Sequence, residues 1–204
     1  MADDAIDFWF FIGSTYTYLA VMRAAEVERA HGVRFAWRPF NVRAIIMEMN
    51  NRPFVGKPVK EAYMWRDLER RAARYGIPIR VPAPYPLKEA DRANRVAVVG
   101  AGEGWCPDYV RATYRRWFQD GQEPGSEPNL SASLREAGQD ATRVLALAGA
   151  EAAGRALDAA TDAARALGIF GVPTFAVGRE IFWGDDRLED AILWHRGAWL
   201  ITPA

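Results

Sequence analysis

The sequence is poor in the residues that support redox and metal chemistry. Among its 204 residues, Cys106 is the single cysteine, and His31 and His195 are the two histidines. One thiol cannot form an internal disulfide, a CxxC pair or a cysteine-rich metal site, and neither histidine has a neighbouring ligand set. We therefore expect no metal centre and no redox cycling within one chain. Cys106 has no nearby base in the sequence and is expected to be inert.

The sequence also lacks a charge excess and long apolar runs. Its 26 Lys and Arg residues balance 26 Asp and Glu residues, so no net field attracts nucleic acid or an anionic membrane. No apolar run approaches the roughly 18 residues that cross a bilayer, and acids rather than bases precede the first short run. We expect a cytoplasmic protein that binds neither nucleic acid nor membranes, so a small organic molecule or another protein is the expected partner.

The first part of the sequence predicts a strand, a helix and a second strand. Residues 8–12 form an aromatic and β-branched run that a glycine ends, which is typical of a buried strand. Ser14 occupies the position of a helix N-cap, and we expect the helix to begin at Ser14 or Thr15 and to end at His31. In residues 33–40 large apolar side chains alternate with small or charged ones, which predicts the second strand.

The rest of the chain predicts a helical middle and a short β-β-α end. Helical spacing recurs in four segments of the middle: 59–75, 89–100, 107–120 and 140–152. After residue 168 the pattern predicts strands at 174–177 and 180–183, joined by a tight turn, and a closing helix at 186–195. This order indicates an α/β fold in which residues 1–42 and 168–204 form one domain and residues 43–167 an all-helical insertion.

Ser14 is the first of three features that could carry chemistry. It lies between the first strand and the first helix, where unpaired N–H groups and the helix dipole favour a negative charge. A thiol placed there ionises more readily, and a serine hydroxyl can donate a hydrogen bond to the sulfur. The alternative is that Ser14 is only a helix cap.

The second feature is Val172-Pro173, directly before a predicted strand. Proline removes a ladder donor there unless it forms a special turn, and a cis peptide bond would explain its presence. Such a bond could leave the Val172 N–H and C=O free to pair with an extended peptide. A trans proline that opens an ordinary strand is the alternative.

The third feature is the segment from Trp183 and Gly184 to the adjacent acids Asp185 and Asp186. Asp186 is well placed as the N-cap of the closing helix. Either carboxylate could instead accept the α-amino group of a peptide ligand. A role as helix N-cap accounts well for one aspartate and less well for two adjacent ones.

Several segments in their order along the chain form a recognisable pattern: Asp7 to Ala20 (DFWFFIGSTYTYLA), Asn51-Arg52-Pro53, Lys60 with Tyr63 and Asp67, Phe170 to Thr174 (FGVPT), and Trp183 to Arg187 (WGDDR). The pattern spans nearly the whole chain and resembles the 2-hydroxychromene-2-carboxylate isomerases, which are relatives of kappa-class glutathione transferases and DsbA-like oxidoreductases. The resemblance implies a thioredoxin-like fold, a glutathione cofactor, a small aromatic carboxylate substrate and a homodimer.

The resemblance also implies a role for particular residues. Ser14 would be the catalytic residue that holds the glutathione sulfur. The other cofactor contacts that it implies are Asn51, Lys60, Val172, Pro173, Trp183, Gly184, Asp185 and Asp186. Substrate contacts are expected from Arg43, Arg52 and Tyr85, the first two as partners of a carboxylate.

Two departures from the family pattern bear on these expectations. Family members usually carry proline after the serine, where this chain has Thr15. Some carry a lysine after the second strand, where this chain offers Arg43. These departures make the substrate less certain than the cofactor. A kappa-type transferase, which would use the same cofactor site and release a glutathione conjugate, is an alternative to the isomerase, and a noncatalytic thioredoxin-like module that binds peptides or proteins through its cis-proline edge is another.

Overall fold

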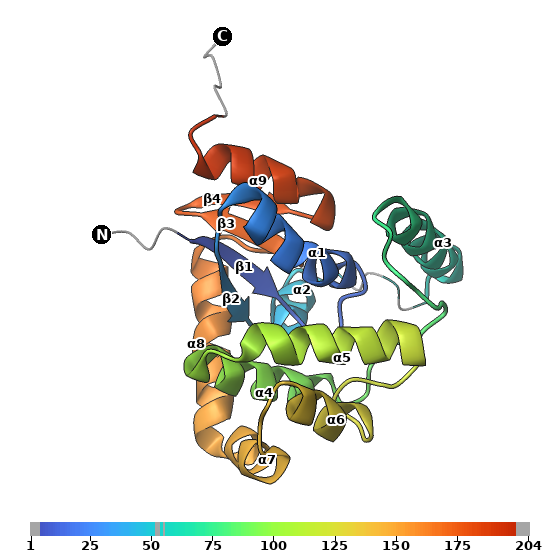
Figure 1. The fold of residues 1–204 in the computed structure, drawn as a ribbon, viewed down its shortest axis with the longest axis vertical. Helices are drawn as coiled ribbons and strands as arrows, with labels where there is room; N and C mark the ends of the chain where they lie inside the picture. Colours follow the sequence, from blue (N-terminus) through green and yellow to red (C-terminus); the bar gives the residue numbers. More distant parts are fainter. Residues whose placement is uncertain (1–4, 52–53, 55, 199–204) are drawn as a thin grey trace.

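A computed structural model describes residues 5–51, 54 and 56–198. Its centre is one mixed sheet with the strand order β2-β1-β3-β4 (Figure 1). The strands are β1 (Ile6–Phe10), β2 (Phe35–Pro39), β3 (Thr174–Val177) and β4 (Glu180–Trp183). β1 pairs in parallel with β2 and antiparallel with β3, and β3 pairs antiparallel with β4. The predicted β-α-β and β-β-α units are confirmed, and β1 begins two residues before the expected strand.

Helix α1 (Thr17–His31) connects β1 to β2 and ends at Gly32, whose φ of 61° suits glycine. Between β2 and β3 the described residues form seven helices. They form no strand there, as the sequence predicts. They are α2 (Val42–Glu48), α3 (Pro58–Arg74), α4 (Ala90–Glu103), α5 (Cys106–Asp120), α6 (Asn129–Glu136), α7 (Ala141–Gly149) and α8 (Glu151–Ala166). After β4 a 3₁₀ turn, η1 (Asp185–Arg187), precedes α9 (Leu188–His195).

Some of the predicted helices are wrong in extent. The single helix expected at 140–152 is two helices, because Ala150 has an extended backbone (φ −70°, ψ 152°) that separates α7 from α8. The sequence pattern also missed α2, α6 and most of α8. The closing helix begins at Leu188 rather than at residue 186, because the two aspartates belong to η1.

The helical middle and the sheet share one core. Tyr18 of α1 stacks on Phe118 of α5 at 4.4 Å between ring centroids, and both rings are buried. Phe8 of β1 stacks on Phe175 of β3 at 5.0 Å. The Tyr18–Phe118 pair joins α5 to the β-α-β unit, and the division into two domains at residues 42 and 168 stays a prediction. None of the helices in the described part of the chain is long and apolar enough to cross a membrane.

Candidate functional site

The turn after β1 brings Ser14 to the edge of the sheet. Gly13 has a φ of 146°, and a Cβ there would lie 2.5 Å from the Phe11 ring, so glycine is required. The expectation that Ser14 caps a helix is wrong. α1 begins at Thr17, and Tyr16, with helical dihedral angles, occupies the cap position without a side-chain cap. Ser14 is left half-buried, with its hydroxyl available for other contacts.

Two buried side chains from the helical middle fix this turn. The Tyr114 hydroxyl of α5 lies 2.9 Å from the carbonyl of Phe11 and 3.1 Å from that of Ser14. The Asn94 side chain of α4 accepts from the Ile12 N–H at 2.9 Å and donates to the Ile12 carbonyl at 2.9 Å. These bonds satisfy backbone groups that no strand partner reaches. Tyr114 also explains why the helix begins late, because its hydroxyl bonds the Ser14 carbonyl that an N-cap would direct into the helix.

The Ser14 hydroxyl reaches across to the loop before β3. It donates to the carbonyl of Val172 at 3.3 Å. The Val172-Pro173 peptide bond is cis, as the sequence predicts. The Val172 N–H forms no hydrogen bond with any residue that the structure describes, whereas its carbonyl is already used by Ser14. A free N–H beside a serine hydroxyl can pair with the backbone of an extended ligand.

The segment after β4 lies against the same loop. The Gly184 N–H donates to the Pro173 carbonyl at 2.9 Å. Asp185 is 1% exposed, and its carboxylate accepts from Arg71 of α3 at 2.7 Å. Burial raises the pKa of Asp185 to about 7, and the Arg71 charge opposes this rise. Asp186 is exposed and caps no helix, so that expectation is also wrong.

Trp183, at the end of β4, forms an exposed aromatic surface next to this loop. Its side chain is 54% exposed and packs edge-on against Phe170 at 4.9 Å between centroids. Both rings flank the cis-proline loop, because Trp183 pairs with Thr174 in the sheet. The sequence predicted Trp183 as a cofactor contact, and its position beside Val172 suits a role as one wall of the site.

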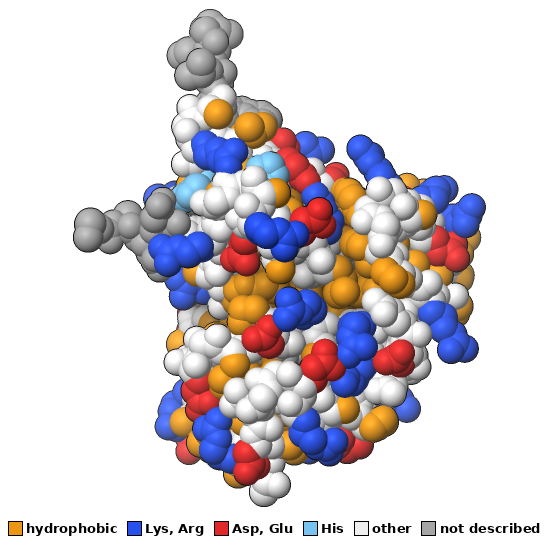
Figure 2. Space-filling view, in the orientation of Figure 1, with side chains coloured by type: hydrophobic (Ala, Val, Ile, Leu, Met, Phe, Trp, Pro, Cys, Tyr) orange, Lys and Arg blue, Asp and Glu red, His pale blue; other side chains and the backbone are white. Residues whose placement is uncertain are grey.

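Helix α3 covers the Ser14 turn through three contacts. Thr15 contacts the Met64 sulfur at 3.1 Å, and the Tyr16 hydroxyl donates to Asp67 at 3.0 Å. The Arg71 guanidinium lies 5.7 Å from the centre of the Tyr16 ring. In Figure 2 apolar side chains gather on this face of the molecule between α3 and α5, which lies below it in the view. Burial and the Asp67 carboxylate raise the pKa of Tyr16, so its hydroxyl stays protonated.

These contacts close into a ring that we call the contact ring. Its members, each in contact with or bonded to the next, are Ser14, Val172, Pro173, Gly184, Asp185, Arg71 and Tyr16, and the chain through Thr15 joins Tyr16 back to Ser14. Among its charged members, Arg71 is the one that the sequence analysis missed. The available signal was the helical spacing of Met64, Asp67 and Arg71, which places all three toward one side of α3.

Two of the predicted substrate residues, Arg43 and Tyr85, lie near each other. Arg43 donates to the Leu87 carbonyl at 3.2 Å, and its guanidinium lies 5.3 Å from the centre of the Phe11 ring. Burial lowers the pKa of Arg43, and Tyr85 lies near enough to act on that pKa. Tyr85 in turn packs edge-on against Trp65 at 5.8 Å. A guanidinium thus lies near the aromatic side chain that precedes the Ser14 turn, and a phenol lies near that guanidinium.

The remaining predicted residues are not members of the contact ring. Lys60, in the first turn of α3, is exposed and lies 5.8 Å from the centre of the Phe54 ring. Asn51 is exposed, and its N–H donates to the Ile46 carbonyl at 2.8 Å. Arg52 lies outside the described residues. Cys106 is buried at the start of α5, and burial raises the pKa of its thiol.

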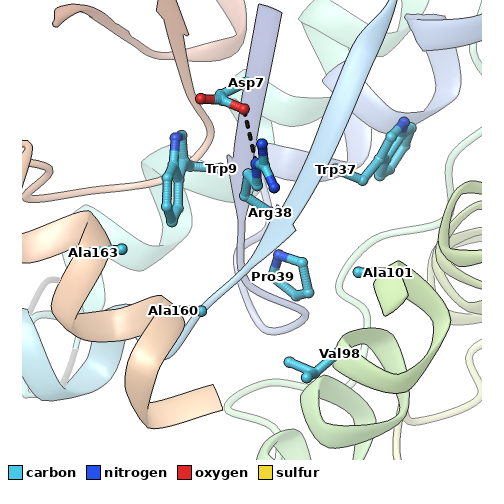
Figure 3. Close-up of a pocket in the computed structure, with 9 residues that line it drawn as sticks. All are labelled: Asp7, Trp9, Trp37, Arg38, Pro39, Val98, Ala101, Ala160 and Ala163. Atoms are coloured by element: carbon cyan, nitrogen blue, oxygen red, sulfur yellow. Dashed lines mark hydrogen bonds and ion pairs between the residues drawn. The ribbon is translucent and has the colours of Figure 1, made fainter. Parts of the chain in front are cut away.

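A pocket of about 350 Å³ lies elsewhere, along β2 between α4 and α8 (Figure 3). Its rim carries an ion pair between Arg38 and Asp7 at 2.8 Å. Trp9 also lines it, and its buried indole N–H has no hydrogen-bond partner among the described residues. The pocket contains none of the predicted site residues and no nucleophile. The contact ring therefore remains the candidate site.

The sheet order, the helices between β2 and β3 and the cis-proline loop define a DsbA-like thioredoxin domain, and residues 5–191 match the family model of the DsbA-like thioredoxin domain. A 2-hydroxychromene-2-carboxylate isomerase of Sphingobium xenophagum is 31% identical over 186 residues, which cover 90% of this chain and 94% of that protein. The chain belongs to the 2-hydroxychromene-2-carboxylate isomerase family.

Two further similarities concern structure and a neighbouring family. A solved structure of a 2-hydroxychromene-2-carboxylate isomerase superposes with a TM-score of 0.83 at 27% identity and covers 95% of this chain and 98% of that one. Glutathione S-transferase kappa 1 of Caenorhabditis elegans is 35% identical over 78 residues, which are 38% of this chain and 34% of that protein.

Proposed function

We propose that this chain is a glutathione-dependent isomerase that converts a small aromatic carboxylate of the 2-hydroxychromene-2-carboxylate type. The observation that carries the proposal is the contact ring, which joins a serine hydroxyl, a free backbone N–H and charges of both signs through one set of contacts. Full-length similarity to isomerases supports the reaction. The kappa-class name of one relative supports the cofactor.

The polar groups in and beside the contact ring match a thiol peptide. The Val172 N–H can donate to a backbone carbonyl of the cysteinyl residue, and the exposed Asp186 carboxylate can accept from an ammonium group. The N–H groups of residues 15–17, at the start of α1, also form no hydrogen bond among the described residues. When bound, glutathione supplies a thiolate that can add reversibly to a conjugated carbon.

In this mechanism Ser14 holds the sulfur rather than acting as a nucleophile. Its hydroxyl is a hydrogen-bond donor that can turn from the Val172 carbonyl to an anion. Together with the N–H groups before α1 and the helix dipole, it lowers the pKa of a thiol placed beside it. Ser14 itself stays protonated throughout, so no base needs to stand next to it.

Arg43 and Tyr85 would orient the substrate. Arg43 is half-buried, and a guanidinium remains charged there because its ordinary pKa is so high. It can bind the substrate carboxylate, and the Tyr85 hydroxyl can donate to a substrate oxygen, since burial raises the pKa of Tyr85 and keeps it protonated. Trp65 and Phe54, which pack edge-on against Tyr85, would form the apolar wall for the ring system.

Ser14→Ala tests the proposal. We expect wild-type chain to lower the pKa of the bound glutathione thiol by about one to two units, and the variant to return it toward its free value near 9. Ultraviolet titration of the thiolate absorbance measures both. Ser131→Ala, which alters a partly exposed serine of α6 that bonds Glu127, serves as the control. A bound thiol with the same pKa in wild type and Ser14→Ala would refute the role of Ser14.

A kappa-type transferase is the second candidate, favoured by the 78-residue similarity to the Caenorhabditis elegans protein. The same cofactor site would serve it, and the difference lies in the product. Incubation with glutathione and an aromatic 2-oxo acid that contains a conjugated double bond separates the two. An isomerase leaves the glutathione concentration unchanged, whereas a transferase converts it to a stable conjugate.

A further inference from the structure

We propose that the pocket along β2 is a second binding site, separate from the contact ring, and that it takes a small apolar molecule that ends in a carboxylate. The pocket has a volume of about 350 Å³ and lies between α4 and α8 (Figure 3). Protein cavities of roughly 300 Å³ and more hold small organic ligands. The pocket shares no residue with the contact ring, so this inference does not depend on the proposed function.

The pairing of β1 with β2 brings three polar side chains to one face of the sheet. Trp9 lies opposite Arg38 in the parallel ladder, and Asp7 precedes Trp9 by two residues on the same strand. Side chains two residues apart on a strand share a face of the sheet, and so do those of directly paired residues. All three line the pocket, and in Figure 3 the nitrogen-bearing end of the Trp9 ring lies on the side of Asp7 and Arg38.

The indole N–H of Trp9 is a hydrogen-bond donor without an acceptor. Trp9 is 5% exposed, and its Nε1 atom is buried and has no hydrogen-bond partner among the described residues. The ring packs edge-on against Phe40 at 5.7 Å between centroids, which restricts its rotation. An unpaired buried donor destabilises the folded chain, and an acceptor that reaches it from the pocket offsets that penalty. This donor therefore favours a ligand that carries an acceptor.

Arg38 supplies a positive charge at the rim of the pocket. Its Nε atom lies 2.8 Å from Asp7 Oδ1, and its side chain is 47% exposed. That pairing holds the guanidinium in place and uses only one of its five N–H donors, and its two Nη groups form no hydrogen bond with the described residues. Two Nη groups can bind the oxygens of a carboxylate together. Because Arg38 already neutralises Asp7, the groups left for a ligand at this end are donors, which select an anionic acceptor.

The rest of the wall is apolar and leaves room for a hydrocarbon body. Ala160 and Ala163 are three positions apart on α8 and line the pocket together, and Val98 and Ala101 do the same on α4. These small side chains leave a space between the two helices that larger ones would fill. The indole of Trp37 also lines the pocket, and an aromatic ring of a ligand can pack against it. The groups of the pocket thus fit an apolar body that ends in a carboxylate.

Nuclear magnetic resonance of the tryptophan indole N–H groups tests the inference. The chain has eight tryptophans, and the signal of Trp9 is the one that Trp9→Phe removes. We expect trans-cinnamate to shift this signal, because a new hydrogen bond changes the resonance of its N–H. Cinnamamide, which has a similar shape without the charge, should bind about fivefold more weakly. Arg38→Met should weaken cinnamate binding by about fivefold and remove the preference for cinnamate over cinnamamide.

Variants of exposed residues separate the pocket from the rest of the surface. Ala163→Leu places a larger side chain in the pocket and should abolish the cinnamate shift of the Trp9 signal. Ala159→Leu changes an exposed alanine of the same helix that does not line the pocket, and it should preserve that shift. Arg34→Met removes an exposed arginine next to β2 and outside the pocket, and it should preserve the preference for cinnamate over cinnamamide.

The expected substrate contact is tested apart from the pocket. Arg43→Met should leave the cinnamate shift of the Trp9 signal unchanged, so the proposed function and this inference can fail independently. A Trp9 signal that does not respond to cinnamate, or a response that survives in Ala163→Leu, would overturn the inference. So would a Trp9 signal that changes with protein concentration alone, because a second copy of the chain would then cover the pocket.

Discussion

Asp185 is a carboxylate that the fold removes from water and gives one cationic partner. Burial raises its pKa to about 7, against an ordinary value of 3.8. Arg71 opposes that rise, and Asp186 from the same turn adds to it. Arg23 of α1 is the other cation that acts on it, and Arg23 is itself paired with Glu189. Asp185 therefore titrates near neutral pH because desolvation outweighs its ion pair.

This gives a signed prediction for stability. Between pH 4 and pH 7 the folded chain holds a proton on Asp185 that the unfolded chain has lost, so the free energy of unfolding from this group falls as pH rises. The total is at most about 4 kcal/mol, at about 1.4 kcal/mol per pKa unit. Urea unfolding at pH 5 and pH 8 gives the free energy of unfolding of wild type and of Asp185→Asn, and the value for wild type minus that for the variant should fall as pH rises. A value that stays constant or grows with pH would contradict the raised pKa.

Helices from the middle of the chain shape the turn that carries Ser14. Tyr114 of α5 bonds the carbonyls of Phe11 and Ser14, and Asn94 of α4 bonds both backbone groups of Ile12. The site thus depends on residues that are 82 to 103 positions away in sequence. Neither tyrosine nor asparagine at these positions carries a sequence signal for such a role, because both lie on helices whose other residues are packed in the core.

Tyr114→Phe tests that dependence at the level of the helix. We expect it to lower the free energy of unfolding by about 1–3 kcal/mol, because two buried carbonyls lose their donor. It should also weaken glutathione binding by loosening the Ser14 turn. Tyr109→Phe is the matched control, since its hydroxyl on the same helix bonds the Ala93 carbonyl away from the turn. If the two variants affect binding equally, α5 does not position Ser14.

The elements show where sequence patterns succeed and fail. β3, β4 and the turn between them lie at the predicted residues, because alternation and a glycine turn are local signals. The predicted start of α1 was wrong because the Ser14 carbonyl and hydroxyl form hydrogen bonds with Tyr114 and Val172, which are distant in sequence. The Arg71 contact was missed for the same reason, since its partner lies 114 residues away.

At the scale of the whole molecule, the candidate site is a junction of segments from all parts of the chain. The turn after β1, helix α3, the loop before β3 and the segment after β4 each contribute to the contact ring. The family resemblance supplied most of the predicted residues, and the structure brings Ser14 next to Val172 and Arg43 next to Tyr85. The expected homodimer and the identity of the substrate stay predictions.

The central claim is that the Ser14 hydroxyl holds a sulfur brought by a peptide cofactor. A crystal structure of the chain soaked with glutathione tests it most directly. We expect the sulfur within about 3.5 Å of Ser14 Oγ, the range of a hydrogen bond to sulfur, with the Val172 N–H donating to the cysteinyl carbonyl. Glutathione bound with its sulfur elsewhere, while the Ser14 hydroxyl still donates to the Val172 carbonyl, would contradict the account.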